Sequence, residues 1–377
     1  MPLVLTLAFR NLFQDRLRFV ATLIGIVFSV VLVMVQLGLY FGFGRMVTTM
    51  IDHASADLWV VASEAKSFED PSLLDTNLRN RLQAINGVAE ATPVVIGFAV
   101  WQPPSGGMTP VFVVGTDMKA KALVPWNIVA GSVDALTESR AVAIDETYEH
   151  RLGVTGIGST AEIRGLPVRV VALTKGIRSF TTTPYVFSDL DHARRYIGLP
   201  PSKSSDFLIR LKPGADIERV RRDIKADVAG VEALTPQQFA SRSRSFWLFG
   251  TGAGAALFAG ALLGVIVGTV IVAQTLYSST KDHIYEFATL RAIGCSKRYI
   301  YRVITDQALI NAVIGFGIAA LIGLAVVRLT AATALPIVIT PAVSIGLFAL
   351  TVVMCVAAAI AAIIRIIRID PVMVMSR

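Results

Sequence analysis

The side chains of this sequence that could do chemistry are few and scattered. The four histidines lie in different segments, and none has a second metal ligand three or four positions away: His53, His150, His192 and His283. The run DETYEH at 145–150 is rich in carboxylates, which a solvated helix face explains more simply than acid–base catalysis. A membrane-anchored hydrolase, the enzymatic alternative, would need a nucleophile beside a base, and no G-x-S-x-G elbow occurs. We therefore assign no catalytic or metal-binding residue.

The motifs of ATP and thiol chemistry are also missing from the sequence. Cys295 and Cys355 are the only cysteines, so no disulfide framework supports the fold. No phosphate-binding loop of the form G-x-x-x-x-G-K-[ST] occurs, and the chain therefore cannot hydrolyse ATP alone. We expect no cofactor in the chain itself.

The most ordered charge pattern lies at 286–302, EFATLRAIGCSKRYIYR. Its apolar residues recur at every third position on one helical face, and these are Phe287, Leu290 and Ile293. Its polar residues point elsewhere, and these are Glu286, Thr289 and Arg291. Gly294 suits the position after a helix end, and Ser296 suits the cap of a new helix. The pattern predicts a short amphipathic helix, a sharp corner and a further helix, which together indicate a docking element.

The composition places this segment in a membrane protein. The chain is 54% hydrophobic with a mean hydropathy of +0.63, more than a soluble domain of this length carries. Apolar runs that reach the roughly 20 residues needed to cross the hydrocarbon core lie at 19–43, 246–277, 303–329 and 342–364. The first run is too long for a signal-peptide core, and no small-x-small cleavage site follows it. We expect it to remain as a signal anchor.

The distribution of charge predicts the orientation. Lys and Arg outnumber Asp and Glu in the N-terminal segment, in the link after the second run and in the C-terminal tail, whereas the large domain at 44–245 is almost neutral. Because positive residues flank spans on the cytoplasmic side, we expect both termini and the link to be cytoplasmic and the large domain to be outside. The formal net charge of +8 then reflects topology and lipid headgroups, and we expect no nucleic-acid partner.

The large domain contains a weak internal repeat that predicts two strand–helix–strand units. The first has DLWVV at 57–61, a helical stretch at 73–85 and GVAEATP at 87–93. The second has DFLIR at 206–210, a helix at about 216–227 capped by Asp216, and GVEALTP at 230–236. Each unit alone leaves an apolar face uncovered, so we expect the two to pair in one α/β subdomain.

The segment between the two units predicts an inserted, strand-rich subdomain. Its expected strands are VFVVGTD, RAVAID, AEIRGLPVRVVAL and TPYVFSD. DETYEHRLG and DLDHARRYIG predict short helices closed by Gly153 and Gly198.

The return of the chain to the membrane is marked by a capping box. Thr235 precedes Pro236, and Gln238 follows three positions after the threonine. A helix over 236–277 would reach roughly 63 Å at about 1.5 Å per residue, so we expect the second span to project as a stalk. Gly250, Gly252 and Gly254 are the positions where a kink would interrupt it.

The expected fold is an α-helical membrane protein with four transmembrane helices and a large α/β periplasmic domain between the first two. Residues 1–18 predict a cytoplasmic amphipathic helix, with a simple extension of the first span as the alternative. The expected parts are 1–18, span one at 19–43, the domain at 44–245, span two at 246–277, the coupling helix and link at 278–302, span three at 303–329, a loop at 330–341, span four at 342–364 and a tail at 365–377. Within the domain we expect the repeat subdomain at 44–107 and 204–235, the insertion at 108–203 and the stalk at 236–245.

The stretch EFATLRAIGCSKRYI resembles the cytoplasmic motif of MacB/FtsX-type (type VII) ABC transporter permeases, which approximates E-I-G-x-L-R-A-[LI]-G-A-[ST]-[KR]-x-x-I. The matching residues are Glu286, Leu290, Arg291, Ala292, Ile293, Gly294, Ser296, Lys297 and Ile300. Phe287, Ala288 and Cys295 replace the commoner Ile, Gly and Ala. The resemblance covers the whole chain, and the start LAFRNLFQDRLRFVATLIGI with QLGLY leans toward the DevC-like branch.

The resemblance implies partners for the link. In this family a cytoplasmic helix between spans two and three fits a groove on a separate ATPase, which binds ATP and Mg, and two permease chains carry two ATPases. The ATPase-coupling residues would be Glu286, Phe287, Thr289, Leu290, Arg291, Ile293 and Gly294. The three apolar residues would be anchors, and the charged pair would orient the contact. The alternative is that the apolar face lies on lipid.

The resemblance also implies a function in the bacterial inner membrane. Such permeases are thought to drive a hydrophobic or amphipathic substrate outside the membrane by mechanotransmission. We expect a homodimer, a periplasmic membrane-fusion adaptor and an outer-membrane channel, with a glycolipid as substrate if the DevC-like branch holds. The alternatives are an FtsX-like subunit that switches a cell-wall hydrolase without transport, and a lipoprotein-releasing permease.

Overall fold

The computed structural model describes residues 16–282, 296–331, 333 and 335–367. They form two compact units, which we describe separately. The helical unit comprises residues up to Gly42, Ala255–Ala331 and the chain from Pro336 onward. The large domain comprises Phe43–Gly254 and the short segment Ala332–Leu335.

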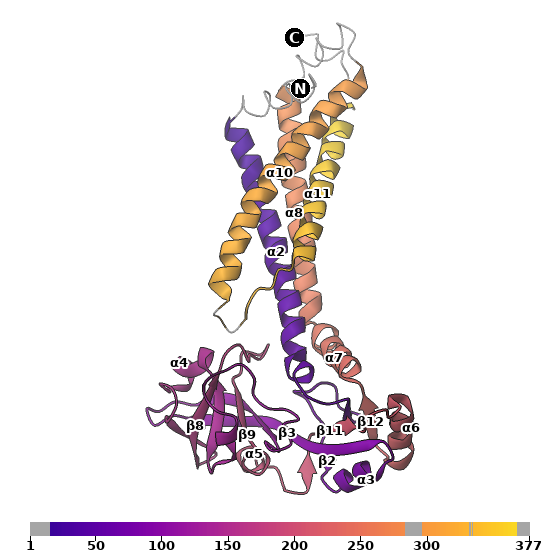
Figure 1. Cartoon of the computed structure of the whole chain (residues 1–377). Coiled ribbons are helices and arrows are strands. Elements are labelled where there is room, and N and C mark those ends of the chain that lie inside the picture. The colour runs from indigo at the N-terminus through magenta and orange to yellow at the C-terminus, as the bar shows by residue number, and fades with distance from the viewer. Residues whose placement is uncertain (1–15, 283–295, 332, 334, 368–377) are drawn as a thin grey trace. The chain divides into compact units, whose positions relative to one another are not determined.

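The helical unit contains four long helices, as predicted (Figure 1). They are α2 (Arg16–Asp52), α8 (Ala253–Asp282), α10 (Lys297–Thr330) and α11 (Pro341–Ile367). Each includes a stretch long and apolar enough to cross a membrane: Phe19–Asp52, Ala253–Ser278, Tyr301–Thr330 and Pro341–Ile364.

Helix α2 is longer than the span predicted for it. It continues past residue 43 to Asp52, and its last turns belong to the large domain. The segment has no proline and only one weak helix former, Gly44, and Thr48 Oγ1 donates to Asp52 Oδ2 at 2.7 Å in the last turn. Met50 and Ile51 are buried in the core of the large domain, so burial rather than lipid sustains these turns.

The continuous stalk helix predicted over 236–277 is wrong. The capping box at Thr235 and Gln238 starts α7 (Pro236–Ser245) as expected, and a π-helical turn, η3 (Phe246–Gly250), follows. Gly252 then adopts a left-handed backbone with φ +79°, which ends the helix before α8 begins at Ala253. The break falls at the middle of the three glycines expected to threaten continuity.

The two repeat units of the large domain pair in one sheet, as predicted. The first is β1 (Leu58–Ala62), α3 (Leu78–Ala84) and β3 (Val88–Gln102). The second is β11 (Asp206–Leu211), α6 (Ile217–Asp227) and β12 (Val231–Leu234). The strand order is β12-β1-β11-β3, and all neighbours are antiparallel. Asp216 caps α6 by accepting from the backbone of Glu218 at 2.9 Å.

The insertion supplies the strands and short helices that were expected, and it adds a strand at 128–131 and a helical turn at 134–137 that were not predicted. Its strands are β4 (Thr109–Thr116), β5 (Ile128–Gly131), β6 (Ala141–Asp145), β7 (Thr160–Ile163), β8 (Leu166–Thr174) and β9 (Tyr185–Asp189). Its helical turns are η1 (Asp134–Thr137), η2 (Glu146–Tyr148), α4 (Glu149–Leu152) and α5 (Leu190–Ile197), and a small sheet joins β2 (Leu74–Asp75) to β10 (Lys203–Ser204). Gly153 and Gly198 close α4 and α5 in left-handed conformations.

Six strands around the insertion close into a ring. β3 pairs with β4, β4 with β9, β9 with β6, β6 with β8, β8 with β7, and β7 pairs back to β3. The ring is a small barrel with its own core, which includes Trp101, Val113 and Ile144. Strand β3 is shared, because its first half pairs with β11 and its second half with β4 and β7.

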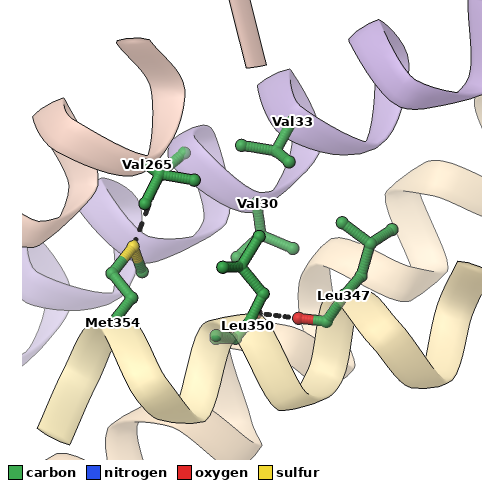
Figure 2. A pocket seen from close by; sticks show the side chains of 8 residues that line it. Val30, Val33, Val265, Leu347, Leu350 and Met354 are labelled. Carbon is green, nitrogen blue, oxygen red and sulfur yellow. Dashed lines mark hydrogen bonds between the residues drawn. The ribbon is translucent and has the colours of Figure 1, made fainter. Parts of the chain in front are cut away.

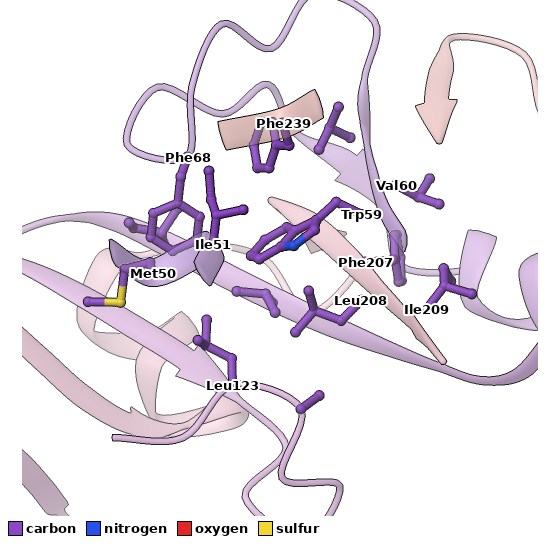
Figure 3. Close-up of a cluster of buried hydrophobic side chains, with 14 of the residues drawn as sticks. Met50, Ile51, Trp59, Val60, Phe68, Leu123, Phe207, Leu208, Ile209 and Phe239 are labelled. Atoms are coloured by element: carbon purple, nitrogen blue, oxygen red, sulfur yellow. The ribbon is translucent and has the colours of Figure 1, made fainter. Parts of the chain in front are cut away.

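A second core lies in the α/β part of the large domain. Trp59 on β1 is fully buried, and its ring contacts Phe68 and Phe239 of α7 (Figure 3). Met50 and Ile51 from the end of α2 join the same cluster. The core therefore ties together the chain that enters the domain and the chain that leaves it.

Candidate coupling site

The predicted coupling residues lie outside the described residues. These are Glu286, Phe287, Thr289, Leu290, Arg291, Ile293 and Gly294, and their role stays a prediction. The two flanks of the link are described. Helix α8 ends at Asp282, and Ser296 precedes α10 with an extended backbone, at the cap position that the sequence predicts. The Ser296 carbonyl accepts from Tyr299 N at 3.0 Å, whereas its side chain makes no cap hydrogen bond.

Helix α8 packs closely on α2 through three glycines spaced four residues apart. A Cβ atom at Gly260, Gly264 or Gly268 would collide with α2, and the side chains it would meet are Gln36, Val33 and Ser29. Ser29 Oγ donates to the Gly264 carbonyl at 2.6 Å, which adds a direct hydrogen bond between the helices. Small residues at this spacing let backbones approach within a membrane. The G-x-x-x-G signal is present in the sequence, but our sequence analysis did not use it.

Helix α10 also packs on α2 through glycines. A Cβ atom at Gly315 would collide with Ile26, and one at Gly323 would collide with Met34. The alanines between and beside these glycines are buried: Ala308, Ala312 and Ala319. Both helices that enter the link therefore rest on the same partner, α2.

The fourth helix completes the packing around Ser29. Ser29 Oγ lies 3.7 Å from Met354 Sδ of α11, within reach of a weak hydrogen bond to sulfur. A cavity of only about 10 Å³ remains here, lined largely by valine and leucine side chains (Figure 2). It is at the lower limit for one water molecule, about 10–15 Å³. The described helices are close-packed at this level.

Inside the large domain, an aromatic cluster holds the end of α2 beside the start of η3. The ring of Phe180 lies 4.9 Å from Phe43 and 4.5 Å from Trp247, measured between centroids. Arg244 Nε donates to the Gly44 carbonyl at 3.3 Å. The entering and leaving segments are thus clamped together by side chains of one domain.

The residues that first suggested other chemistry have structural roles. Asp145, in DETYEH, is buried and accepts from the backbone amides of Thr147 at 3.1 Å and Ile177 at 2.7 Å. His53 stacks on Trp126 at 3.9 Å. Over the described ranges no three His, Cys, Asp or Glu side chains gather as metal ligands would. Cys355 is a buried free thiol.

Comparison with protein families agrees with this two-part architecture. Residues 19–227 match the family model of the MacB-like periplasmic core domain, and residues 245–371 match that of the FtsX-like permease C-terminal domain. The chain belongs to the MacB/FtsX-type ABC transporter permeases. Neither matched domain of this permease is an ATPase, and its family implies an ABC ATPase partner.

Three solved structures similar to this permease are of separate domains. The periplasmic region of MacB from Actinobacillus actinomycetemcomitans is 12% identical, with TM-score 0.38 and coverage of 51% of this chain and 94% of that one. The extracellular domain of the transporter YknZ from Gram-positive bacteria is 13% identical, with TM-score 0.34 and coverage of 48% and 99%. A domain of a permease protein from Porphyromonas gingivalis is 14% identical, with TM-score 0.34 and coverage of 48% and 90%. A search of curated protein sequences finds no match.

Proposed function

We propose that this permease couples ATP hydrolysis by a separate ATPase to movement of its large domain, and thereby exports or extracts a hydrophobic or amphipathic molecule at the outer face of the membrane. The observation that carries the proposal is the position of α2. Helices α8 and α10, which enter the link, both pack on α2, and α2 runs unbroken to Asp52 within the large domain.

The packing supports transmission of force rather than passage of a substrate between the helices. Close-packed interiors transmit displacement because their side chains have no space in which to yield. A shift of the link would displace the ends of α8 and α10 and, through the glycine contacts, α2. The apolar packing around Ser29 and Met354 supports a route outside the bundle.

Substitutions in the predicted docking face test the contact with the ATPase. Replacing Phe287 and Leu290 with Asp places two carboxylates where apolar anchors are proposed, and we expect co-purification with the ATPase to be lost while membrane insertion persists. Val129→Asp is the matched control, because it makes the same change at an exposed apolar position of the large domain. Unchanged ATPase binding by the Phe287 and Leu290 variants would remove the docking role.

The complete assembly that we propose is a homodimer carrying two ATPases, with ATP and Mg bound by the ATPases. It lies in the inner membrane with cytoplasmic termini. A periplasmic adaptor and an outer-membrane channel would receive the substrate, and a glycolipid is the proposed cargo if the DevC-like branch applies. Purification with a hydrolysis-deficient ATPase, followed by mass spectrometry of retained lipids and proteins, tests this assembly.

The match of residues 245–371 to an FtsX-like domain favours one further candidate, a signalling subunit that transports nothing. The same purification distinguishes export from signalling. Retained lipid with an adaptor supports export, whereas a retained cell-wall hydrolase or coiled-coil activator without lipid supports signalling. A retained lipoprotein would indicate release of lipoproteins.

A further inference from the structure

The loop between β1 and β2 carries polar side chains into the interior of the large domain. Ser67 and Phe68 have no exposed surface, and Glu69 is only 6% exposed. Burying polar groups costs free energy unless they are hydrogen-bonded, so the partners of Ser67 and Glu69 decide whether this loop is stable.

The first partner is the π-helical turn by which the chain leaves the domain. Trp247 Nε1 donates to Ser67 Oγ at 3.0 Å. Lys66 Nζ lies 5.5 Å from the centroid of the Phe246 ring, within the range of a cation–π contact. Two adjacent loop residues thus hold two adjacent residues of η3. π-helical turns are rare, and they occur frequently at functional sites.

The second partner is the barrel. Tyr185 Oη, at the start of β9, donates to Glu69 Oε1 at 3.0 Å, and both groups are buried. Phe68, between the two polar residues, packs edge-on against Trp59 of β1 at 5.8 Å. One short loop therefore joins the barrel, the α/β sheet and the returning chain.

We propose that residues 64–70 form a latch that fastens the π-helical turn at Trp247 to the barrel strand at Tyr185. The source of the movement that opens the latch rests on the proposed function, but the latch itself does not. When the latch is closed, η3 and β9 move as one body. When the hydrogen bond of Ser67 to Trp247 or that of Glu69 to Tyr185 breaks, the chain between α7 and the break at Gly252 moves independently of the barrel.

The ionisation of Glu69 biases this latch. Burial raises the pKa of its carboxyl to about 7, and its own backbone amide, the Tyr185 hydroxyl and the nearby Trp247 indole offset only part of that rise. The titratable groups around it are Lys66 and Asp70 of its own loop and Tyr185 of β9, with Tyr148 behind Tyr185, while η3 contains no titratable residue. The closed latch therefore holds the proton more tightly than the open one, so this stabilisation is complete below the ordinary pKa of 4.5 and is lost as pH rises through about 7, because the cost of burying the carboxylate outweighs its hydrogen bonds.

Hydrogen exchange of the full-length protein in lipid nanodiscs tests the coupling. Tyr185→Phe removes only the hydroxyl that holds Glu69, and we expect protection to fall roughly fivefold, the factor for one ordinary hydrogen bond, in both 63–73 and 244–250. Tyr196→Phe is the matched control, because Tyr196 is also a buried tyrosine of the large domain and its hydroxyl has no hydrogen-bond partner among the described residues. It should leave both segments unchanged.

The pH dependence is tested in the same preparation. After correction for intrinsic exchange, protection of 244–250 in the wild type should be lower at pH 8.5 than at pH 5.5, and Glu69→Gln should remove that difference. Loss of protection in 63–73 alone, or an equal loss across the whole domain, would overturn the latch. A pH difference that persists in Glu69→Gln would overturn the role of its ionisation. The experiment contains no ATPase or substrate, so its outcome tests the latch even if the proposed function is wrong.

Discussion

At the scale of single residues, Asp206 stands out in the large domain. It begins β11, it has no exposed surface, and neither carboxylate oxygen has a hydrogen-bond partner in the described part of the chain. The adjacent Ser205 exchanges hydrogen bonds with the backbone of Ile96 instead. Burial raises the pKa of Asp206 well above its usual value, because the apolar surroundings favour the neutral acid over the carboxylate.

The pH dependence of stability follows from this shift. Since the folded state of Asp206 binds a proton more tightly than the unfolded state, stability is fully present at acidic pH and falls as pH rises above the unfolded pKa toward the folded one. Glu69 acts in the same direction, and its rise from 4.5 to about 7 corresponds to about 3 kcal/mol.

Replacing Asp206 with Asn keeps the shape and removes the ionisation. We expect the thermal midpoint of the wild type to be lower at pH 8 than at pH 5. This decrease should be several degrees smaller for Asp206→Asn. Scanning fluorimetry of the full-length protein in detergent measures both midpoints. Parallel curves for the two proteins would show that Asp206 does not titrate on unfolding. Asp134→Asn, an exposed acid, is the control.

At the scale of elements, the glycines of α8 decide how the helices pack. Gly268 faces both Ser29 of α2 and Met354 of α11, so a methyl group there would force two helices apart. Gly317 of α10 has nothing within 4 Å of a Cβ position. Replacing each glycine with alanine therefore adds the same methyl group at a closely packed position and at an open one.

We expect Gly268→Ala to destabilise the helical unit by about 1–3 kcal/mol, the cost of overpacking a close contact. Gly317→Ala should be neutral or stabilising by up to about 1 kcal/mol, since alanine is the better helix former. Thermal unfolding of both variants in the same detergent makes the comparison. Equal midpoints would mean that α8 and α2 separate without cost.

Elements with local signals could be predicted from the sequence, and elements that depend on distant contacts could not. The capping box at Thr235, the Asp216 cap and the left-handed Gly153 and Gly198 each act within a few residues. The closure of β7 onto β3 joins residues about 60 positions apart and has no local pattern. The break at Gly252 was visible only as an excess of glycine, because glycine permits a left-handed turn without requiring one.

At the scale of the whole molecule, cysteine labelling tests the predicted orientation in the membrane. The two native cysteines are replaced with alanine, and single cysteines are introduced at Lys119 in the large domain or at Lys281 near the end of α8, both exposed. A membrane-impermeant maleimide should label Lys119→Cys from outside the inner membrane. It should label Lys281→Cys only after that membrane is opened. The reverse pattern would place the large domain in the cytoplasm.

The candidate sites differ in how far sequence reasoning could reach them. The docking face predicted at 287–293 rests on apolar residues at every third position, and this period is visible in the sequence. The latch joins the loop after β1 to Tyr185 and Trp247, which lie more than 100 residues away, so only the fold brings them together. The glycine contacts of α8 were within reach, because their spacing of four is periodic.

The strand order β12-β1-β11-β3 bears on how the protein is made. The first strand of the large domain has its two neighbours about 150 and about 170 residues downstream, so it emerges from the ribosome long before it can pair. At about 5–20 residues per second it waits roughly 10–30 s with both edges open, a hazard for mispairing with other chains. β12 completes the sheet immediately before α7 leads into α8. The sheet therefore cannot close until residue 234 has been made, just before the segment of the second membrane helix follows, and any delay in synthesis before that point prolongs the exposure of β1.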